Sequence, residues 1–493
     1  MHVTTKPNEQ HGRGQIDFTW EQFAKDCLLN KYALVVGSEV ILNREVYPEA
    51  NGNSTQFLFD KTLYSIATNE IEAEYCDNGQ PVPENEILEE YHHLKRRYKN
   101  FTQLDRKYKD VKKQVLKSTH RLMENKDGFV NSIDPSLLQL LKTRCFRIVI
   151  TTAIDPLLEL AMEEVWGYHG FDVIQIENAK QAFNTVTYDE FNVNRPILCY
   201  MFGKIDTSNS LEKNRFVLSE NQAIEKIAKW FDSVEQNGFL KYLRNYSIFS
   251  VGPQFSDWMF RFFWYLLRGE IGKNSGNQQV VVEIKNEDPN LVNYLEMENV
   301  RVFLDAREFM GYAIDQINKA LPLLTEPRRD QGVFISYSHK DRYIAMPLFE
   351  RLRAENIPVW IDDEKLDDGD EFKDRITNAI NTCRLFLPIL STSIREQITT
   401  GTIKQQWYYE NEWSLIDKRY NNEEKKHEEI RETNENSHPQ HSFRTVPFIV
   451  GDYNYSKEYH QELPSCIKNA SINDTFTLAK DRIEHLIQII QNK

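Results

Sequence analysis

The stretch that decides the fold is Gly332-Val333-Phe334-Ile335-Ser336-Tyr337-Ser338, a short apolar run that ends in hydroxyl side chains. Such a run, bounded by polar residues, is typical of a strand buried on both faces of a parallel sheet. Ile344, Leu348 and Leu352 follow at the spacing of an amphipathic helix. A second apolar run at 357–361 completes a strand–helix–strand order, which predicts parallel strands.

The same alternation continues toward the C-terminus. We expect a helix that presents Phe372, Ile376, Ala379, Ile380 and Cys383 on one face. A strand at 385–390, a helix near 407–419, a strand at 446–450 and a helix near 478–490 follow. This order predicts a flavodoxin-like, doubly wound sheet. The charged segment 421–441 is expected to be a solvated loop or a helix extension without a function of its own.

The N-terminal region shows a second α/β pattern with short apolar runs. We expect these runs to be buried strands of a Rossmann-like parallel sheet: 32–36, 147–151, 172–176, 196–201, 247–251, 280–284 and 300–303. An insertion at 84–142 is rich in Glu, Lys, Leu and Tyr and has almost no Gly or Pro, which predicts a pair of helices.

A linker separates the two patterns. Residues 305–324 have helical apolar spacing, and the predicted helix ends at Pro322 and a polar stretch at 325–330. The expected organisation is therefore a tail over 1–17, a first domain over 18–304, a linker helix over 305–330 and a second domain over 331–493.

Composition excludes several functional classes. The chain of 493 residues has 60 Lys and Arg against 74 Asp and Glu, a net charge of −14, which disfavours general nucleic-acid binding. No apolar run approaches the ~20 residues of a membrane span, no secretory signal is present, and no polybasic run would hold the chain on a membrane. We expect a cytoplasmic protein without a metal site, because its cysteines form no C-x-x-C pair. They are Cys27, Cys76, Cys145, Cys199, Cys383 and Cys466.

The second domain contains five motifs of a known family in the family's order. They are 334–338 with Lys340-Asp341, then 359–362, then 366–370, then 385–391, then Glu412-Trp413. Together they resemble a Toll/interleukin-1 receptor (TIR) domain over about 331–493. In that resemblance 366–370 corresponds to the BB loop, through which the family makes head-to-tail contacts. Gly369 is expected to provide a turn there, and Asp370 to cap the next helix.

The resemblance implies cleavage of NAD, with an essential glutamate on the helix after the third strand. Glu412 takes that place. NAD is then the substrate, and no further cofactor is implied. Nicotinamide is already a cationic leaving group, so no general acid is required. One ionised carboxylate near the ribose can stabilise the oxocarbenium-like transition state, as in glycosidases.

One departure concerns the spacing of a tryptophan. Family members usually have Trp, three residues and then the Glu, whereas Trp407 lies five residues before Glu412 and three before Glu410. A spacing of five turns two side chains apart on a helix. Glu412 is favoured because Trp413, Leu415 and Ile416 continue the apolar face, and Glu410 remains the rival.

The resemblance also implies residues around the nicotinamide and ribose. The candidates for binding NAD are Tyr337, Ser338, Trp360, Asp362, Phe372 and Trp407. Tyr337 is either a core aromatic residue or a wall of the pocket. Trp360, which points from a strand, is read as a core residue more readily than as a ligand contact.

The first domain resembles sirtuin-like domains over about 18–303. Val35-Val36-Gly37-Ser38, the segment 150–159, Tyr200-Met201-Phe202-Gly203 and the segment 249–257 follow the order of that family's motifs. Three positions depart from it, because the catalytic Asn and His correspond to Ala153 and Phe202, and Glu39 follows the shortened glycine turn. Ala cannot orient a hydroxyl and Phe cannot act as a base. We therefore expect this domain to have lost catalysis and NAD binding, with Asp155 and Asp257 left as caps.

Three functions follow as hypotheses. The first is a TIR-type NAD glycohydrolase, or ADP-ribosyl cyclase, controlled by an inactive sirtuin-like domain. Pairings of this kind resemble bacterial anti-phage defence proteins, which implies homo-oligomers through both domains and a phage-derived trigger. The second is a non-catalytic scaffold, which the irregular position of Trp407 favours. The third gives NAD cleavage to the sirtuin-like domain, which Ala153 and Phe202 disfavour.

Overall fold

The computed structural model describes the chain in segments. The described residues are 18–46, 54–76, 83–97, 108–124, 131–167, 170–175, 195–206, 216–217, 220–233, 238–252, 257–268, 279–282, 289–298, 300–303, 305–325, 332–355, 357–361, 370–391, 394, 407–433, 443–450, 463, 465–468 and 486–488. They fall into two compact units. The first is built mainly from residues 31–314, and the second mainly from residues 315–488, with which α1 (Trp20–Leu28) is grouped.

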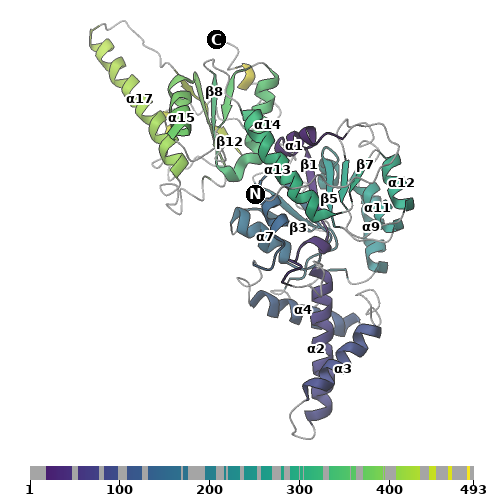
Figure 1. The fold of residues 1–493 in the computed structure, drawn as a ribbon. Helices are drawn as coiled ribbons and strands as arrows, with labels where there is room; N and C mark the ends of the chain where they lie inside the picture. The colour runs from purple at the N-terminus through teal and green to yellow at the C-terminus, as the bar shows by residue number, and fades with distance from the viewer. Residues whose placement is uncertain are drawn as a thin grey trace. The chain divides into compact units, whose positions relative to one another are not determined.

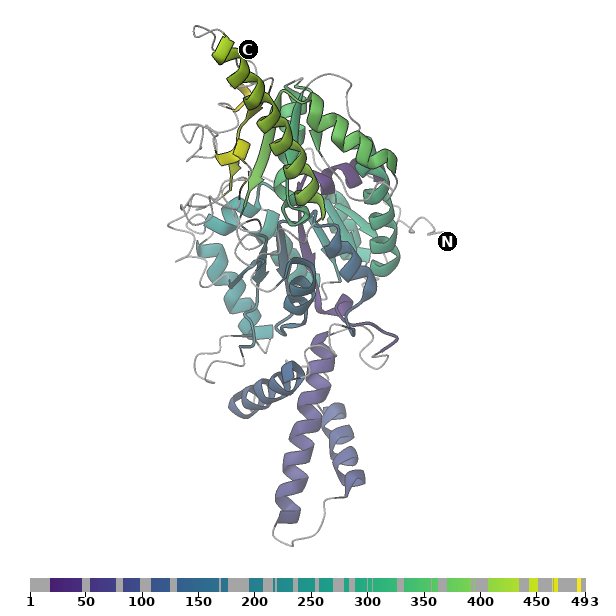
Figure 2. The same ribbon diagram turned by 90° about the vertical axis from the view of Figure 1, so that its left-hand side faces the viewer.

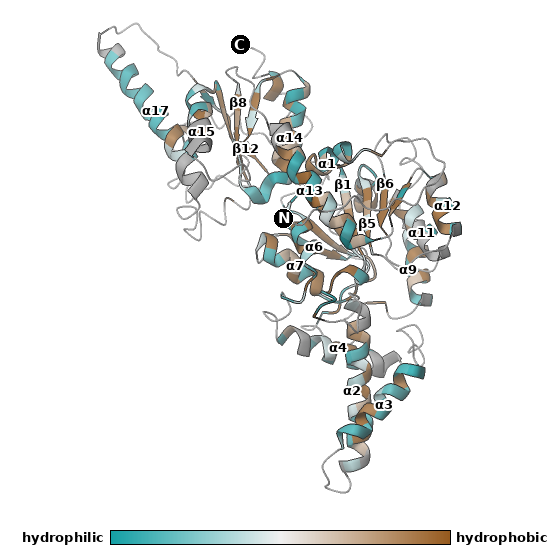
Figure 3. Ribbon diagram, in the orientation of Figure 1, coloured by the Kyte–Doolittle hydropathy of each residue, from teal (hydrophilic) through white to brown (hydrophobic). Residues whose placement is uncertain are grey.

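The first unit is organised on a seven-stranded parallel sheet (Figure 1). In spatial order its strands are β3 (Asp172–Gln175), β4 (Ile197–Tyr200), β2 (Ile148–Thr151), β1 (Tyr32–Val36), β5 (Ser247–Val251), β6 (Gln279–Val282) and β7 (Val300–Phe303). At the centre, Val36 pairs with Thr151 on one side and with Val251 on the other. The strands form the hydrophobic interior (Figure 3).

The strand β3 does not have the burial that the sequence predicts. Asp172 and Val173 are exposed, and the next two residues are half-buried. β3 is the end strand of the sheet and pairs with β4. An edge position has a neighbour on one side only, so an apolar run such as Val173-Ile174 does not guarantee burial there.

Helices flank the sheet of the first unit. They are α6 (Pro135–Lys142), α7 (Leu157–Trp166), α9 (Glu220–Ser233), α10 (Gly238–Leu243), α11 (Asp257–Arg268), α12 (Pro289–Met297) and the first part of α13 (Ala306–Thr325), whose residues from 315 on are grouped with the second unit. Asp134 begins α6 by accepting hydrogen bonds from the backbone N–H groups of Ser136 and Leu137. α13 continues past Pro322 to Thr325, within one residue of the predicted helical range of 305–324. A proline near the end of a helix removes one N–H donor without stopping the last turn.

The helical insertion is larger than a pair of helices. Within 84–142 the described helices are α3 (Glu84–Arg97), α4 (Tyr108–Glu124) and α6, and α2 (Ser54–Cys76) precedes that range. Figures 1 and 2 show α2 and α3 side by side and extending away from the sheet. The sequence prediction missed α2 because its apolar residues are distributed around the whole helix and give no single stripe.

The second unit has the predicted doubly wound topology. Its parallel strands lie in the order β11 (Arg444–Thr445), β10 (Leu385–Leu390), β8 (Val333–Ser336) and β9 (Val359–Ile361), and β12 (Phe448–Ile449) also pairs with β10. The helices are η6 (His339–Asp341), α14 (Arg342–Ala354), α15 (Asp370–Thr382), α17 (Trp407–Thr433) and α19 (Ser465–Lys468).

Three details of this unit differ from, or extend, the sequence prediction. Within the range 446–450, where one strand is expected, only β12 (Phe448–Ile449) forms, and β11 (Arg444–Thr445) precedes the range; Pro447, which has no N–H to donate, lies between the two. α17 extends to Thr433, so residues 421–433 are a helix extension. Most of the helix expected at 478–490 lies outside the described residues.

The described cysteines are buried free thiols, as expected, and Cys76 has no described side chain. Within the described segments no helix is both long and apolar enough to cross a membrane.

Gly332 gives a test of the second unit's packing. A Cβ at Gly332 would lie 2.1 Å from the carbonyl oxygen of Pro358, which cannot move without shifting β9. We expect Gly332→Ala to lower the free energy of unfolding of this unit by about 1–3 kcal/mol, measured by urea denaturation of the full chain.

Gly311→Ala is the matched control for this substitution. Nothing lies within 4 Å of a Cβ at Gly311, which is inside α13. We expect this change to be neutral or to stabilise by up to about 1 kcal/mol. Equal stability of the two variants would contradict the close approach at Pro358.

Candidate functional site

Glu412 lies one turn and a half into α17, and its side chain is only 4% exposed. The Ser336 hydroxyl donates a hydrogen bond of 2.6 Å to Glu412 Oε2. Trp413 Nε1, on the neighbouring residue, donates to Ser336 Oγ at 3.3 Å. A buried carboxylate is therefore held by a side chain from the other end of the domain's sequence.

The two hydrogen bonds have a fixed direction. An indole N–H can only donate, so Ser336 Oγ accepts from Trp413 and has its own proton left for the carboxylate. Trp413 is itself fixed because its ring packs in the core cluster with Phe334 and Ile380. The chain from Trp413 through Ser336 to Glu412 thus fixes the Oε2 side of the carboxylate.

Ser336 lies at the place in the sheet where ligands are expected. It is the last residue of β8, and β8 lies between β9 and β10, where the strand order reverses. Open α/β sheets bind ligands outside the carboxyl ends of strands at such a point. Glu412 therefore lies at the carboxyl edge of this sheet, next to the end of β8.

A second pair of buried side chains forms a hydrogen bond next to the end of the neighbouring strand β10. The Ser391 hydroxyl donates to Asp341 Oδ2 at 2.5 Å, and both residues are fully buried. Ser391 directly follows β10, and Asp341 ends η6 after β8. The strand ends that surround Glu412 are thus joined by side-chain hydrogen bonds as well as by the sheet.

Polar contacts on two sides fix the position of α17. Arg419 Nη1 donates to the carbonyl oxygens of Ile380 (2.5 Å) and Cys383 (3.0 Å) at the end of α15. Its guanidinium also lies 4.4 Å from the centre of the Phe443 ring. Asp417 accepts from the backbone N–H of Ser465 at the start of α19. The axial position of Glu412 is therefore determined by contacts further along its own helix.

The cysteines of this unit are not nucleophiles in the structure. Burial raises the pKa of Cys383 to about 11, although the nearby charge of Arg419 acts in the opposite direction. Burial and the charge of Asp417 raise the pKa of Cys466 to about 12. Both remain thiols at neutral pH, and nucleophilic attack needs the thiolate.

The structure describes three of the predicted NAD-binding side chains. Tyr337 and Ser338 are buried directly after β8, and the Tyr337 ring lies 5.5 Å from that of His339. Trp360 is half-buried and stacks on Phe334 at 5.1 Å between ring centres, so it packs against the core. Tyr337 and Ser338 thus adjoin Ser336, whereas Trp360 contacts the apolar cluster.

The other predicted residues are described only in part. Asp362 and Gly369 lie outside the described residues, as do the side chains of Phe372, Asp370, Trp407 and Glu410. Trp407 begins α17, so it and Glu412 are five residues apart on one helix.

The sequence reasoning missed two residues that matter for this site. Ser336 was quoted in the strand motif without a role, although a hydroxyl at the last position of a central strand is a usable signal. Arg419 gave no signal, because a helix arginine followed by Glu423 at i+4 is typical of a solvated face.

At the corresponding edge of the first unit, two of the described residues are buried and have side chains without polar groups. Phe202 is buried and its ring lies 6.0 Å from that of Trp230 on α9. Ala153 is fully buried, and its N–H donates to Thr151 Oγ1. These are the positions where the family resemblance implies a catalytic His and Asn. Neither residue has a side-chain group that can exchange a proton.

Buried side chains occupy the turn that follows Gly37 in the first unit. Ser38, Glu39 and Val40 form the short helix η1 after β1, and all three are buried. A Cβ at Gly252, which has φ +64°, would lie 2.6 Å from Val40 Cγ1. Val40 thus packs directly on the turn after β5, and the carboxylate of Glu39 adds a charge that repels phosphate.

Asp155 directly precedes Pro156, the N-cap of α7, and its side chain accepts hydrogen bonds in the turn before this helix. Its Oδ2 accepts from the Ser54 hydroxyl at 2.8 Å and its Oδ1 from the N–H of Leu157 at the start of α7. Burial raises the pKa of Asp155 above its usual value, and these two hydrogen bonds offset the effect only in part. For Asp257, the first residue of α11, no side chain is described.

Comparison with known families agrees with the two units. Residues 147–303 match the family model of a SIR2-like domain, and residues 333–486 match that of a TIR domain. A search of curated proteins gave no match. The chain therefore joins a SIR2-like domain to a C-terminal TIR domain.

Removal of the Ser336 hydroxyl tests the buried hydrogen-bond chain. Ser336→Ala leaves both the Glu412 carboxylate and the Trp413 N–H without their shared partner. We expect the free energy of unfolding of the TIR domain to fall by about 1–3 kcal/mol. Ser414→Ala, on the same helix and half-buried, is the control and should change it by less than about 0.5 kcal/mol.

The raised pKa of Asp155 predicts a pH-dependent stability of the SIR2-like domain. Because the pKa is higher in the folded than in the unfolded state, folding favours the protonated carboxyl. That contribution is complete below the unfolded pKa and is lost as the pH rises through the folded pKa. Asp155→Asn cannot ionise, so wild type should lose stability relative to it as the pH rises above the usual pKa of an Asp carboxyl, about 3.9, measured by urea unfolding. A difference that stays constant with pH would contradict the prediction.

Proposed function

From a chain that joins a SIR2-like domain to a TIR domain, we propose an NAD glycohydrolase whose active site is in the TIR domain. The observation that supports it is the position of Glu412. Its carboxylate is held at the carboxyl end of β8 by Ser336, at the edge where such sheets bind ligands. The resemblance to TIR domains assigns the essential carboxylate to this residue.

In this proposal the bond that breaks joins the nicotinamide nitrogen to C1′ of the ribose. The bonding electrons leave with nicotinamide, which becomes neutral, and positive charge develops on the ribose. The Glu412 carboxylate stabilises that charge, while the Ser336 hydroxyl holds its Oε2 in place. Water then attacks C1′ and releases a proton, which gives ADP-ribose. Attack by the adenine ring instead would give the cyclic product.

Tyr337 and Ser338 are the described residues best placed to contact the substrate, because they directly follow Ser336. Asp362, Phe372 and Trp407 belong to the same proposed pocket on the basis of the family resemblance. NAD is the substrate in this scheme, and no other cofactor is required.

The SIR2-like domain acts in the proposal as a regulator without catalytic activity. Phe202 and Ala153 at the positions of the catalytic pair support this role, as does the packing of Val40 on Gly252. The domain would respond to a phage-derived trigger or assemble the chain into oligomers. The protein would then deplete cytoplasmic NAD in bacterial anti-phage defence.

A non-catalytic scaffold is the second candidate. The burial of Glu412 favours it, because only 4% of that residue is exposed in the single chain. The displaced position of Trp407 favours it too. In that case the TIR domain would recruit other TIR domains and the buried carboxylate would be structural.

Nicotinamide release from NAD by the concentrated full chain separates these candidates. We expect Glu412→Gln to lower the rate by at least about a hundredfold, because the amide cannot stabilise the ribose cation. Glu410→Gln on the same helix is the matched control and should keep most of the activity.

Each other outcome indicates a different function. Loss of activity in Glu410→Gln alone would transfer the role to Glu410. Release that survives both substitutions would place the reaction in the SIR2-like domain. Absence of release from wild type and variants, at concentrations at which the TIR domains associate, would favour the scaffold.

A further inference from the structure

The helix α3 forms one side of the helical insertion and packs on α2. Ile87 and Leu94 are buried in this contact. Lys95 Nζ pairs with Asp60 of α2 at 2.9 Å, and the Tyr64 and Tyr91 rings contact at 5.8 Å. One face of α3 is thus fixed to α2, and the opposite face is exposed.

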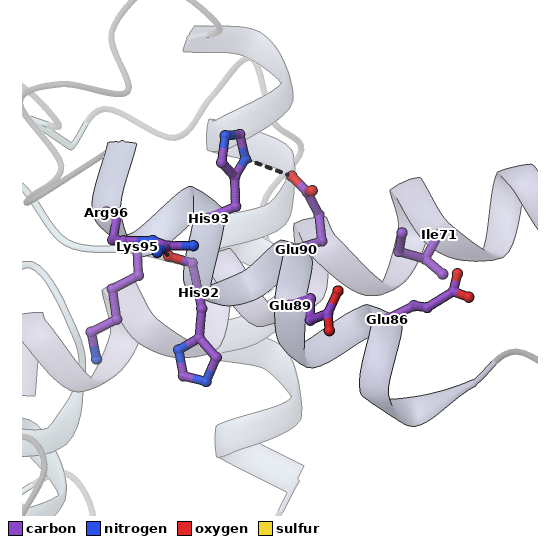
Figure 4. Close-up of a pocket in the computed structure, with 8 residues that line it drawn as sticks. All are labelled: Ile71, Glu86, Glu89, Glu90, His92, His93, Lys95 and Arg96. Atoms are coloured by element: carbon purple, nitrogen blue, oxygen red, sulfur yellow. Dashed lines mark hydrogen bonds and ion pairs between the residues drawn. The ribbon is translucent and has the colours of Figure 1, made fainter.

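The exposed face of α3 has opposite charges at its two ends. Glu84 and Glu89 are exposed in the N-terminal half, and Arg96 and Arg97 are exposed in the C-terminal half. Figure 4 shows a surface hollow on this helix, with Glu86, Glu89 and Glu90 toward one end and Lys95 and Arg96 toward the other. We call the exposed face formed by Glu84, Leu88, Glu89, His92, His93, Arg96 and Arg97 the α3 face.

We propose that the α3 face binds the same face of a second copy of this chain, with the two helices antiparallel. Turning one copy through a two-fold axis places the acidic half of each helix against the basic half of the other. A two-fold interface requires a patch that is complementary to itself, and this charge order meets that requirement.

Other kinds of partner fit the α3 face less well. A nucleic acid or an anionic membrane would meet the carboxylates of Glu84 and Glu89 as well as the arginines. A uniformly charged protein would be repelled at one end of the helix. The exposed Leu88 adds apolar area among the charged residues, which suits a protein partner.

The net negative charge of the whole chain opposes pairing of two copies. With a net charge of −14, two copies repel each other unless specific contacts oppose the repulsion. The helical insertion extends away from the sheet (Figure 2). Its α3 face has acidic residues at one end and basic residues at the other, so two copies can form attractive contacts there. The inference concerns assembly through the SIR2-like unit and does not rest on NAD cleavage.

Sedimentation of the full chain without NAD tests the proposal. One variant, Glu84→Lys with Glu89→Lys, makes the α3 face basic, and another, Arg96→Glu with Arg97→Glu, makes it acidic. We expect each to raise the dissociation constant of self-association by at least about tenfold at low salt. An equimolar mixture of the two should associate again, because a basic face then meets an acidic one. The variant with all four substitutions should also self-associate.

Exposed residues elsewhere in the same unit supply controls of equal charge. Glu164→Lys with Glu225→Lys matches the basic variant, and Lys142→Glu with Lys229→Glu matches the acidic one. Both control variants should associate as wild type does. A wild-type chain that stays monomeric, α3 variants that associate like wild type, or a mixture that does not associate would each overturn the proposal. Since NAD is absent, failure here is distinguishable from failure of the proposed enzyme activity.

Discussion

The hydrogen bond from the Ser336 hydroxyl to the Glu412 carboxylate is the contact on which the candidate active site depends. It joins residues 76 positions apart and connects α17 to the end of the central strand β8. A buried carboxylate without such a donor would cost several kcal/mol or take up a proton. The position of α17 relative to the sheet is therefore constrained by chemistry as well as by apolar packing.

The remaining contacts of α17 also fix the position and rotation of this helix. Ile416 and Trp413 pack into the core, Asp417 binds the start of α19, and Arg419 binds the end of α15. A small rotation of the helix would break several of these contacts together, so Glu412 has little freedom. Preorganised groups stabilise developing charge best, because they need no rearrangement during the reaction.

The sequence predicted the central strands well and the site's contacts poorly, for one physical reason. Apolar runs such as 333–336 and 385–390 carry local information, because both faces of a central strand must be buried. At the edge of a sheet the same apolar pattern gave a wrong prediction of burial, because Val173 in β3 is exposed. Glu412 was identified from family resemblance, whereas its bond to Ser336 depends on how distant segments fold together, which no spacing along the chain encodes.

The two domains place contrasting chemistry at equivalent edges of their sheets. In the TIR domain a carboxylate, a hydroxyl and an indole N–H meet after the central strand. In the SIR2-like domain the corresponding edge has Ala153 and the Phe202–Trp230 contact, and Val40 packs on Gly252. Apolar side chains at these positions stabilise the fold by burial but cannot transfer protons. This contrast favours chemistry in the TIR domain and leaves recognition or assembly, for which the exposed helical insertion is suited, to the SIR2-like domain.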